Sequence, residues 1–252
     1  HSATTSIEVE RRTVGDPLET VVAPFLDMTI AGAAFQSDID GAFSVDGLTG
    51  PQPVSASLSG ALVSVTNLQS ANASFTGTIN ENSPFDLLWD GANSDPSERM
   101  TYRAIVESSQ FVRTVFPSLA WLDTTVPAFV NLNDQCNAFF DGTAVNMFRG
   151  GSVCNATGRI FDTVAHEWGH GLDHNLPGGL AEGALAEFIA DMVAFVQTDD
   201  HLIAPGFFVG GGAVRDLEST FAECFDASVT GVHDAGQMLG GTRAGGAVAE
   251  LP

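Results

Sequence analysis

Lysine is absent from this chain of 252 residues: all nine basic residues are arginines, and they stand against 31 acidic residues. The formal net charge at pH 7 is therefore -22. Such a chain repels polyanions over a Debye length of about 10 Å at ordinary salt, and it attracts metal ions and small cations. The charge balance excludes nucleic acid as an expected partner and favours a secreted or salt-exposed protein.

Long hydrophobic runs are also missing. No apolar stretch approaches the roughly 18 residues that a membrane-spanning helix needs, because Gly, Asp or Ser interrupts the longest ones. Hydrophobic residues nevertheless make up 44% of the chain and include 18 phenylalanines, which is enough for a packed core. The sequence begins at His1, with neither a methionine nor a basic and apolar leader. We therefore expect a soluble, extracellular protein in a mature or trimmed form.

Cysteine is scarce: the chain has three, so they cannot all pair with one another. Cys136 and Cys154 are separated by 18 positions, and the segment between them contains three glycines. Because such a loop is flexible enough to bring the two sulfurs together, we predict a disulfide, worth about 3 kcal/mol if unstrained. Three free thiols in the unfolded, unreduced protein would contradict it. Cys224 lies among apolar neighbours and is expected to be a buried thiol.

The first part of the chain has the pattern of β-strands. Residues 54–60, VSASLSG, alternate apolar and polar side chains, and residues 73–79, ASFTGTI, are rich in β-formers. Asp38 and Asp40 belong to DIDG, which predicts a hairpin turn because Asp and Gly tolerate positive φ. A Ca²⁺ loop is the alternative, although no bidentate glutamate follows at the required offset. We expect residues 1–85 to form a β-sandwich-like module, regulatory-like or propeptide-like.

Helical patterns begin at about residue 95. A helix of about 18 residues is expected from a cap at Asp95 or Ser97 to Pro117. A strand is expected in residues 126–132, and two strands across an Asp-Gly turn are expected in residues 138–148. Two helices follow, in residues 157–175 and 181–197. The predicted fold class is α+β, with a natural boundary near residues 80–95.

Three of the six histidines lie in residues 166–174, HEWGHGLDH. Helix positions four apart share a face, so the imidazoles of His166 and His170 can close on one ion. Glu167 lies about 100° round the helix, where it can reach a water on that ion without being a ligand. This pattern predicts a zinc site, and the alternative is a pair of helix-surface histidines without a partner.

A catalytic zinc ion takes three protein ligands and keeps one position open. Glu187 follows His170 by 17 residues, and Asp191 lies one turn beyond Glu187 on the same helix face. A helical hairpin turning at LPGG would make Glu187 the third ligand and Asp191 the acceptor for a ligand histidine's second ring N–H. The alternatives are a solvated acidic helix face and, as third ligand, His174, which lies about 6 Å further along the helix axis.

Separate segments, in this order along the chain, resemble the thermolysin-like and fungalysin-like zinc metallopeptidases, the gluzincins. The resemblance covers roughly residues 97–240 and rests on the segments CNAFFDGTAVNMFRGG, VAHEWGHG, GALAEFIAD, GAVRDLEST and GVHDAGQ. The resemblance implies that Asn137 and Ala138 hold the substrate backbone. It also implies that Arg215 contacts a substrate carbonyl and that His233 stabilises the oxyanion, roles that suit a guanidinium and an imidazole.

The chain departs from this family in two respects. Its only tyrosine, Tyr102, lies outside the expected cleft, and Pro252 follows His233 by 19 residues where the family has a long helical lobe. We therefore expect residues 86–252 to form a zincin-like domain that lacks most of this lobe. A second chain or a homo-oligomeric assembly is a possible partner that would complete it.

The expected function is a secreted zinc endopeptidase that acts on a peptide or protein substrate. Zn²⁺ bound to two histidines and a glutamate would activate a water, with Glu167 as general base and with His233 and Arg215 holding the oxyanion. The alternative is a catalytically weak or inactive peptidase-fold protein that serves as a structural, adhesive or assembly subunit.

Overall fold

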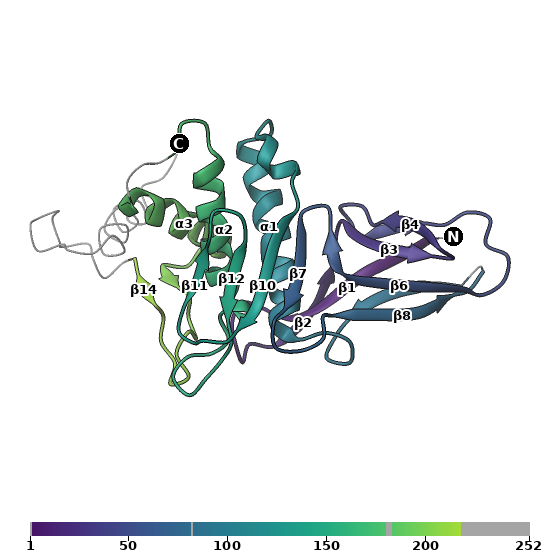
Figure 1. Cartoon of the computed structure of the whole chain (residues 1–252), viewed down its shortest axis with the longest axis horizontal. Coiled ribbons are helices and arrows are strands. Elements are labelled where there is room, and N and C mark those ends of the chain that lie inside the picture. The colour runs from purple at the N-terminus through teal and green to yellow at the C-terminus, as the bar shows by residue number, and fades with distance from the viewer. Residues whose placement is uncertain (1, 82, 180–182, 218–252) are drawn as a thin grey trace, which may run out of the picture.

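The structure is a computed structural model that describes residues 2–81, 83–179 and 183–217 (Figure 1). Its first strands are β1 (Ser2–Glu10), β2 (Leu18–Val22), β3 (Leu26–Ile30), β4 (Ala33–Gln36), β5 (Ala42–Ser44), β6 (Gln52–Gly60), β7 (Val63–Asn67), β8 (Ser74–Ile79) and β9 (Phe85–Trp89). They are followed by α1 (Pro96–Val115), the 3-10 helix η1 (Ala120–Asp123), β10 (Val126–Leu132), β11 (Ala138–Phe140), β12 (Val145–Phe148), the 3-10 helix η2 (Thr157–Arg159), α2 (Phe161–Asn175), α3 (Gly183–Thr198), β13 (Leu202–Ile203) and β14 (Arg215–Asp216). The predicted α+β class is confirmed. Among the described helices, none combines the length and apolar character needed to cross a membrane.

Two sheets contain most of the described strands. One has the order β2-β1-β5, with β9 also paired to β1, and the other has the order β11-β12-β10-β7-β6-β3-β4, with β8 paired to β6. β10 and β7 pair in parallel, with Val126 opposite Val63. Strands from both sides of the boundary predicted between residues 85 and 86 therefore share a sheet, and β9 spans the boundary itself. The division into two domains stays a prediction.

The segment DIDG forms a tight turn but not a hairpin. Oδ1 of Asp38 accepts the backbone N–H groups of Asp40 and Ala42, each at 2.9 Å, and Gly41 has a φ of 68°. The flanking strands do not pair with each other, because β4 pairs with β3 while β5 pairs with β1. The hairpin prediction is wrong, since a turn motif determines local direction and not which strands become partners. The alternative of a calcium loop here stays a prediction.

Helix α1 begins at a complete capping box. Its N-cap Asp95 accepts the backbone N–H of Ser97 at 2.9 Å, and Glu98 accepts the backbone N–H of Asp95 at 2.8 Å. Pro96 occupies the first turn, where its missing N–H costs nothing. On the buried side, the hydroxyl of Tyr102 donates to the carbonyl of Pro24 at 2.7 Å. The chain's only tyrosine is thus a core residue.

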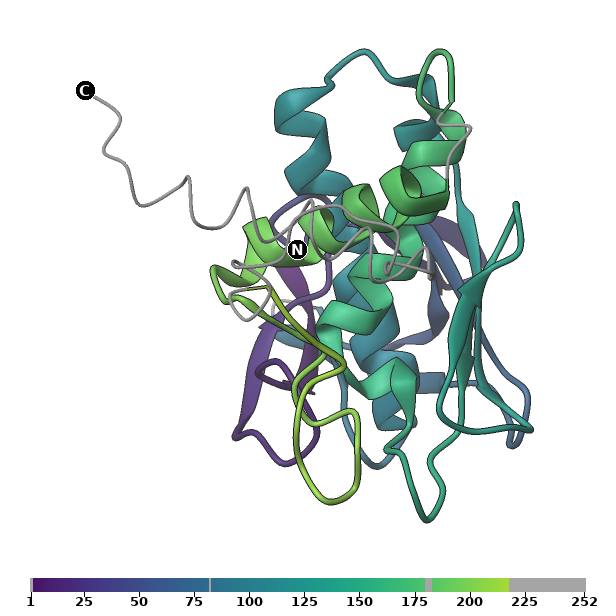
Figure 2. The ribbon, with the colours of Figure 1, turned by 90° about the vertical axis from the view of Figure 1, so that its left-hand side faces the viewer.

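The three α-helices lie on one side of strands β10 to β12 (Figure 2): α1 packs on β7 and β10, α2 packs beside it on β11 and β12, and α3 packs mainly on α2. Apolar side chains from both sheets and all three helices form one continuous core. Its largest fully buried side chains include Trp89 and Trp168. Trp168 belongs to α2 and stacks on Trp121 with ring centroids 5.0 Å apart. This contact packs α2 against the 3-10 helix η1, which contains Trp121.

Candidate metal centre

Helix α2 carries the histidine motif. Asp162 lies in its first turn, where a carboxylate faces the positive end of the helix dipole, and Nδ2 of Asn175 donates to the carbonyl of Gly171 at the other end. His166 is buried and His170 is half-buried. Their Nε2 atoms lie 3.1 Å apart, with the ring planes at 86°. The helical spacing therefore places both imidazole nitrogens at one point beside the helix.

Helix α3 approaches α2 closely at a glycine. A Cβ atom on Gly169 would lie 2.8 Å from the Cα of Ala190, closer than carbon atoms pack in a protein core. Because Gly169 has no Cβ, α3 lies close enough to α2 for the side chains of Glu187 and Asp191 to reach the histidines. Oε2 of Glu187 lies 3.4 Å from Nε2 of His166. His166 pairs with both of these acids, and His170 pairs with Glu187.

The donor atoms fit a tetrahedral zinc ion. Nε2 of His166 and Nε2 of His170 are 3.1 Å apart, while Oε2 of Glu187 lies 3.4 Å from the first and Oε1 of Glu187 lies 3.5 Å from the second. In a tetrahedral site, ligand atoms about 2.0–2.1 Å from zinc are roughly 3.3–3.4 Å apart. Two imidazole nitrogens and one carboxylate oxygen are also a donor set that zinc prefers in catalytic sites. The three residues therefore have the chemistry and the proximity to hold the ion.

Asp191 orients His166. Nδ1 of His166 lies 2.8 Å from Oδ1 of Asp191, and Nη2 of Arg215 donates to the same oxygen at 2.5 Å. Because the carboxylate oxygen accepts both hydrogen bonds, we assign the proton to Nδ1, so that Nε2 keeps its lone pair. Nη2 of Arg215 and Nδ1 of His166 are then both donors, and they lie 3.3 Å apart because they share one acceptor oxygen. Burial alone would raise the pKa of Asp191, but His166 and Arg215 hold it below its usual value.

The ionisable groups of this centre perturb one another in the absence of metal. Burial alone would lower the pKa of His166, but its hydrogen bonds to Asp191 and Glu187 raise the pKa to about 10. Burial raises the pKa of Glu167 to about 7, although the charge of His166 and the backbone N–H of Phe140 oppose the rise. Glu167 can therefore both accept and release a proton near neutral pH.

A cavity of about 1160 Å³ opens over these residues. On the side opposite α2 and α3 it is lined by Asn137, Ala138 and Phe139, which lie in and just before β11. β11 is the last strand in the order of the described sheet and pairs with β12. One side of its backbone is therefore available to an extended chain lying in the cavity.

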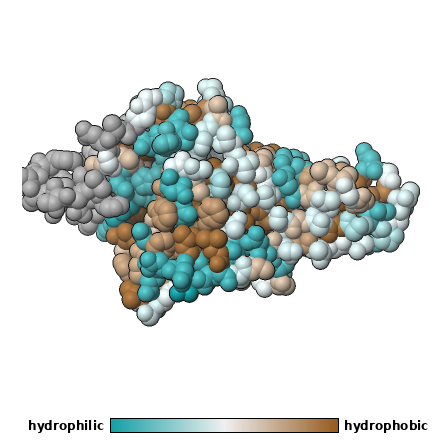
Figure 3. Space-filling view, viewed as in Figure 1, coloured by the Kyte–Doolittle hydropathy of each residue, from teal (hydrophilic) through white to brown (hydrophobic). Residues whose placement is uncertain are grey.

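The rim of the cavity is apolar. Hydrophobic side chains gather in the space-filling view over the region of β11 and β14, next to hydrophilic ones (Figure 3). The exposed apolar residues of this region are Phe139, Val153, Phe208, Val209 and Val214. The backbone N–H of Val209 donates to the carbonyl of Val153 at 2.9 Å, so two loops join to form this rim.

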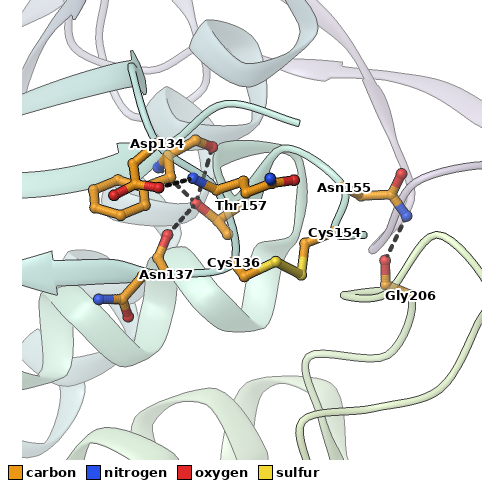
Figure 4. The surroundings of a disulfide bond; sticks show 9 residues. Asp134, Cys136, Asn137, Cys154, Asn155, Thr157 and Gly206 are labelled. Atoms are coloured by element: carbon orange, nitrogen blue, oxygen red, sulfur yellow. Dashed lines mark hydrogen bonds between the residues drawn. A yellow bond between two sulfur atoms is a disulfide. The ribbon is translucent and has the colours of Figure 1, made fainter. Parts of the chain in front are cut away.

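A disulfide ties the cavity wall together (Figure 4). Cys136 and Cys154, the pair predicted from the sequence, have an S–S distance of 2.12 Å and a Cα–Cα distance of 5.2 Å. Beside it, Oγ1 of Thr157 donates to the carbonyl of Asn137 at 3.1 Å, and Nδ2 of Asn155 donates to that of Gly206 at 2.8 Å. These links hold the residue before β11 and the segment that precedes β14. The predicted free cysteine at position 224 lies outside the described residues.

An arginine in the loop after β1 links the start of α2 to the segment that follows α3. Arg12 donates to both oxygens of Asp162, at 2.9 and 2.6 Å, to Asp200 at 2.5 Å and to the carbonyl of Leu202 at 2.7 Å. Asp162 is fully buried and also accepts the backbone N–H of Ala204 at 3.0 Å. This network fixes the start of α2 to the segment that leads to Arg215. The sequence analysis missed Arg12, because 150 residues separate it from Asp162 and no motif connects them.

The structure brings most of the predicted site residues together. The predicted residues that line the cavity are Asn137, Ala138, His166, Glu167, His170, Glu187 and Arg215. Asp191 does not line the cavity but contacts His166. His233 lies outside the described residues, and its role stays a prediction. The rival ligand His174 is exposed, and its ring lies 6.3 Å from that of Phe140. Among the described residues, potential ligand atoms of His166, Glu167 and His170 all lie within 4.8 Å of one another; this group contains neither His174 nor Glu187. Glu187 is nevertheless within 3.4 and 3.5 Å of the two imidazoles, through different carboxylate oxygens.

Comparison with known proteins supports the fold. No protein-family model and no curated protein matches the chain. Among solved structures, the fold is similar to that of the precursor of protealysin, a metalloproteinase from Serratia proteamaculans. The TM-score is 0.55 and the sequence identity 17%, over 79% of this chain and 69% of that chain. At this identity the likeness shows a metalloproteinase-related fold, and the chemistry has to be argued from the site itself.

Proposed function

We propose that this protein is a secreted zinc-dependent endopeptidase whose metal ligands are His166, His170 and Glu187. The observation that carries the proposal is the convergence of their side chains: the two Nε2 atoms are 3.1 Å apart, and the two oxygens of the Glu187 carboxylate lie 3.4 and 3.5 Å from them. Two imidazoles and a carboxylate are ligands of catalytic zinc, which keeps one position open. The metalloproteinase-related fold supports it. The disulfide and the net charge of -22 support secretion, because disulfides persist in oxidising compartments.

Glu167 is the proposed general base. When bound, zinc would polarise a substrate carbonyl and lower the pKa of a water. Glu167 lies in the same cavity and is buried, so its carboxylate can take the proton from the attacking water and deliver it to the leaving amine. A pKa of about 7 before metal binding suits both transfers. Asp191 holds the Nδ1 proton of His166 and so keeps its Nε2 directed at the metal position.

The free side of β11 is the proposed binding site for the substrate backbone. An extended peptide would add to this edge as a further strand, with its backbone held near Asn137 and Ala138. Arg215 also lines the cavity, and its guanidinium, held by Asp191 through Nη2, is the proposed donor to a substrate carbonyl. The apolar rim provides contacts for substrate side chains.

The test is the substitution Glu167→Gln, assayed on a denatured protein substrate with and without a chelator. We expect the variant to retain zinc by elemental analysis, because Glu167 is not a ligand, and to lose about 10²–10⁴-fold in hydrolysis. Glu81→Gln, at an exposed carboxylate far from the motif, is the matched control and should leave the rate unchanged. Hydrolysis by Glu167→Gln at near the wild-type rate would refute the mechanism. A zinc-loaded wild type that cleaves no peptide would favour a scaffold protein instead.

A further inference from the structure

The Cys136–Cys154 disulfide joins two parts of the cavity wall that an extended substrate would touch. Cys136 lines the cavity and directly precedes Asn137 and Ala138, at the start of the free side of β11. Cys154 is fully buried and forms an isolated antiparallel bridge with Phe208, which belongs to the apolar rim. One covalent bond therefore connects the start of β11 to the rim, and Figure 4 shows it between the hydrogen bonds that hold these two segments.

The rim end of the disulfide is held by several hydrogen bonds. The backbone N–H of Asn155 donates to the carbonyl of Phe207 at 2.8 Å, and that of Val209 donates to the carbonyl of Val153 at 2.9 Å. Nδ2 of Asn155 adds a third bond, to the carbonyl of Gly206 at 2.8 Å. The two loops therefore form one unit, and the disulfide is attached to it.

The strand end of the disulfide lies in a turn that needs an external constraint. Cys136 has a φ of 64°, in the left-handed region that a residue with a side chain adopts when its surroundings impose it. The carbonyl of Asn137 lies 3.1 Å from the hydroxyl oxygen of Thr157, but the carbonyl of Phe148 lies 3.2 Å from the same oxygen. A hydroxyl has one proton, so it can donate fully to only one of these carbonyls. The disulfide therefore gives this turn a constraint that the shared hydroxyl cannot supply.

The metal centre is built from other contacts. The proposed ligands lie on α2 and α3, and these helices meet where Gly169 faces Ala190. The far end of β11 is also held separately, because Phe140 pairs with Val145 and its backbone N–H interacts with Glu167. Loss of the disulfide should therefore free the start of β11 and leave the zinc ligands and the general base in place.

We propose that the Cys136–Cys154 disulfide positions the substrate, because it holds the start of β11 at a fixed distance from the apolar rim. The inference rests on the proposed peptidase function. With the bond closed, a peptide that adds to β11 finds the backbone groups of Asn137 and Ala138 in place while its side chains reach the rim. Without the bond, the peptide has to order this turn as it binds, and the entropy lost in doing so weakens binding. The chemistry on a bound peptide is unchanged.

The experiment uses peptides that share one cleavage site and extend from it by increasing lengths. The variants are Cys136→Ala, Cys154→Ala and the double variant, each loaded with zinc. We expect KM for the longest peptides to rise about fivefold for each hydrogen bond to β11 that is lost, while kcat stays within about threefold of wild type. The shortest peptide, which reaches little of β11, should show the smallest change. Ser152→Ala, at an exposed position in the same loop as Cys154, is the matched control and should leave KM unchanged.

Each cysteine substitution removes the same bond, so the two single variants and the double variant should show equal losses. Losses that add in the double variant, a fall in kcat at constant KM, or a change in KM that is independent of peptide length would each overturn the inference. Zinc affinity, measured by competition with a chromogenic chelator, should stay within about twofold of wild type, and a larger loss would overturn it too. Absence of cleavage by the zinc-loaded wild type would instead refute the proposed function.

Hydrogen exchange tests the positioning without catalysis. In the zinc-loaded double variant, amide protons of β11 should exchange about tenfold faster than in wild type, because the start of the strand opens locally. Amide protons in the middle of α2 report global unfolding and should change less. Folded wild type whose disulfide is reduced by a phosphine, with oxidation of the phosphine to its oxide by water, gives the same comparison without a variant. If β11 accelerates no more than α2, the inference is wrong, because the disulfide then stabilises the whole fold and not this strand.

Discussion

Gly169→Ala should damage the metal centre although residue 169 is not itself a metal ligand. Its new Cβ would lie 2.8 Å from Cα and 3.4 Å from Cβ of Ala190. Carbon atoms in contact prefer about 3.5–4.0 Å, so the two helices have to separate by roughly 1 Å. Overpacking of this kind costs about 1–3 kcal/mol. The higher helix propensity of alanine returns about 1 kcal/mol, so the net loss of stability should be small, about 0–2 kcal/mol.

The larger effect of Gly169→Ala falls on zinc. Glu187 and Asp191 lie on either side of Ala190, so both move with the backbone that the new Cβ displaces. A shift of roughly 1 Å takes the Glu187 carboxylate out of bonding range of an ion held by His166 and His170, because metal–ligand distances tolerate only about 0.2 Å. We expect zinc affinity to fall about 10–100-fold or more, the range observed when groups that support metal ligands are removed.

A competition titration against a chromogenic chelator measures the affinity, and urea unfolding of the metal-free protein measures the stability. Gly91→Ala is the control, because a Cβ on Gly91 meets nothing within 4 Å, and it should leave zinc affinity unchanged. A Gly169→Ala variant that unfolds at the wild-type midpoint and binds zinc within twofold of wild type would refute the claim that helix contact sets the geometry of the site.

Two further predictions concern charge. Arg12→Met should lower the free energy of unfolding by about 3–5 kcal/mol in urea titrations, because it leaves the fully buried Asp162 without its cation. The control Arg113→Met removes a more exposed ion pair and should lower the free energy of unfolding by less than about 1 kcal/mol. Equal losses in the two variants would contradict the role of Arg12. Because the raised pKa of His166, about 10, leaves its proton bound at pH 8 without metal, zinc binding should release about one proton per ion at that pH. Apparent affinity should therefore rise with pH up to about 10, and calorimetry in buffers of different ionisation enthalpy that detects no proton release would contradict the assignment.

The parts of the site that were predictable from sequence are those set by helical periodicity. The spacing of His166 and His170 requires only that their segment be a helix, and α2 covers it. Glu187 and Asp191 were predictable for the same reason, given a hairpin that returns α3 to α2. Strands β10, β11 and β12 were also predicted close to their observed bounds, because their alternation and the Asp-Gly turn are local signals.

What could not be predicted depends on contacts between distant segments. Nothing local marks Arg12 as the partner of Asp162, and nothing marks β7 as the parallel neighbour of β10. The pairing of Arg215 with Asp191 could not be predicted either, because 24 residues separate them and no local pattern connects them.

The position of β11 at the end of its sheet also bears on how copies of the protein behave at high concentration. A strand whose backbone can accept an extended peptide can equally accept a strand from another molecule, which is the first step of edge-to-edge aggregation. The charge of -22 opposes that encounter, but only over the Debye length, which shrinks from about 10 Å at 0.1 M salt to about 3 Å at 1 M. Salt concentration therefore sets how well the acidic surface protects the open edge, and solubility should depend on it more than folding does.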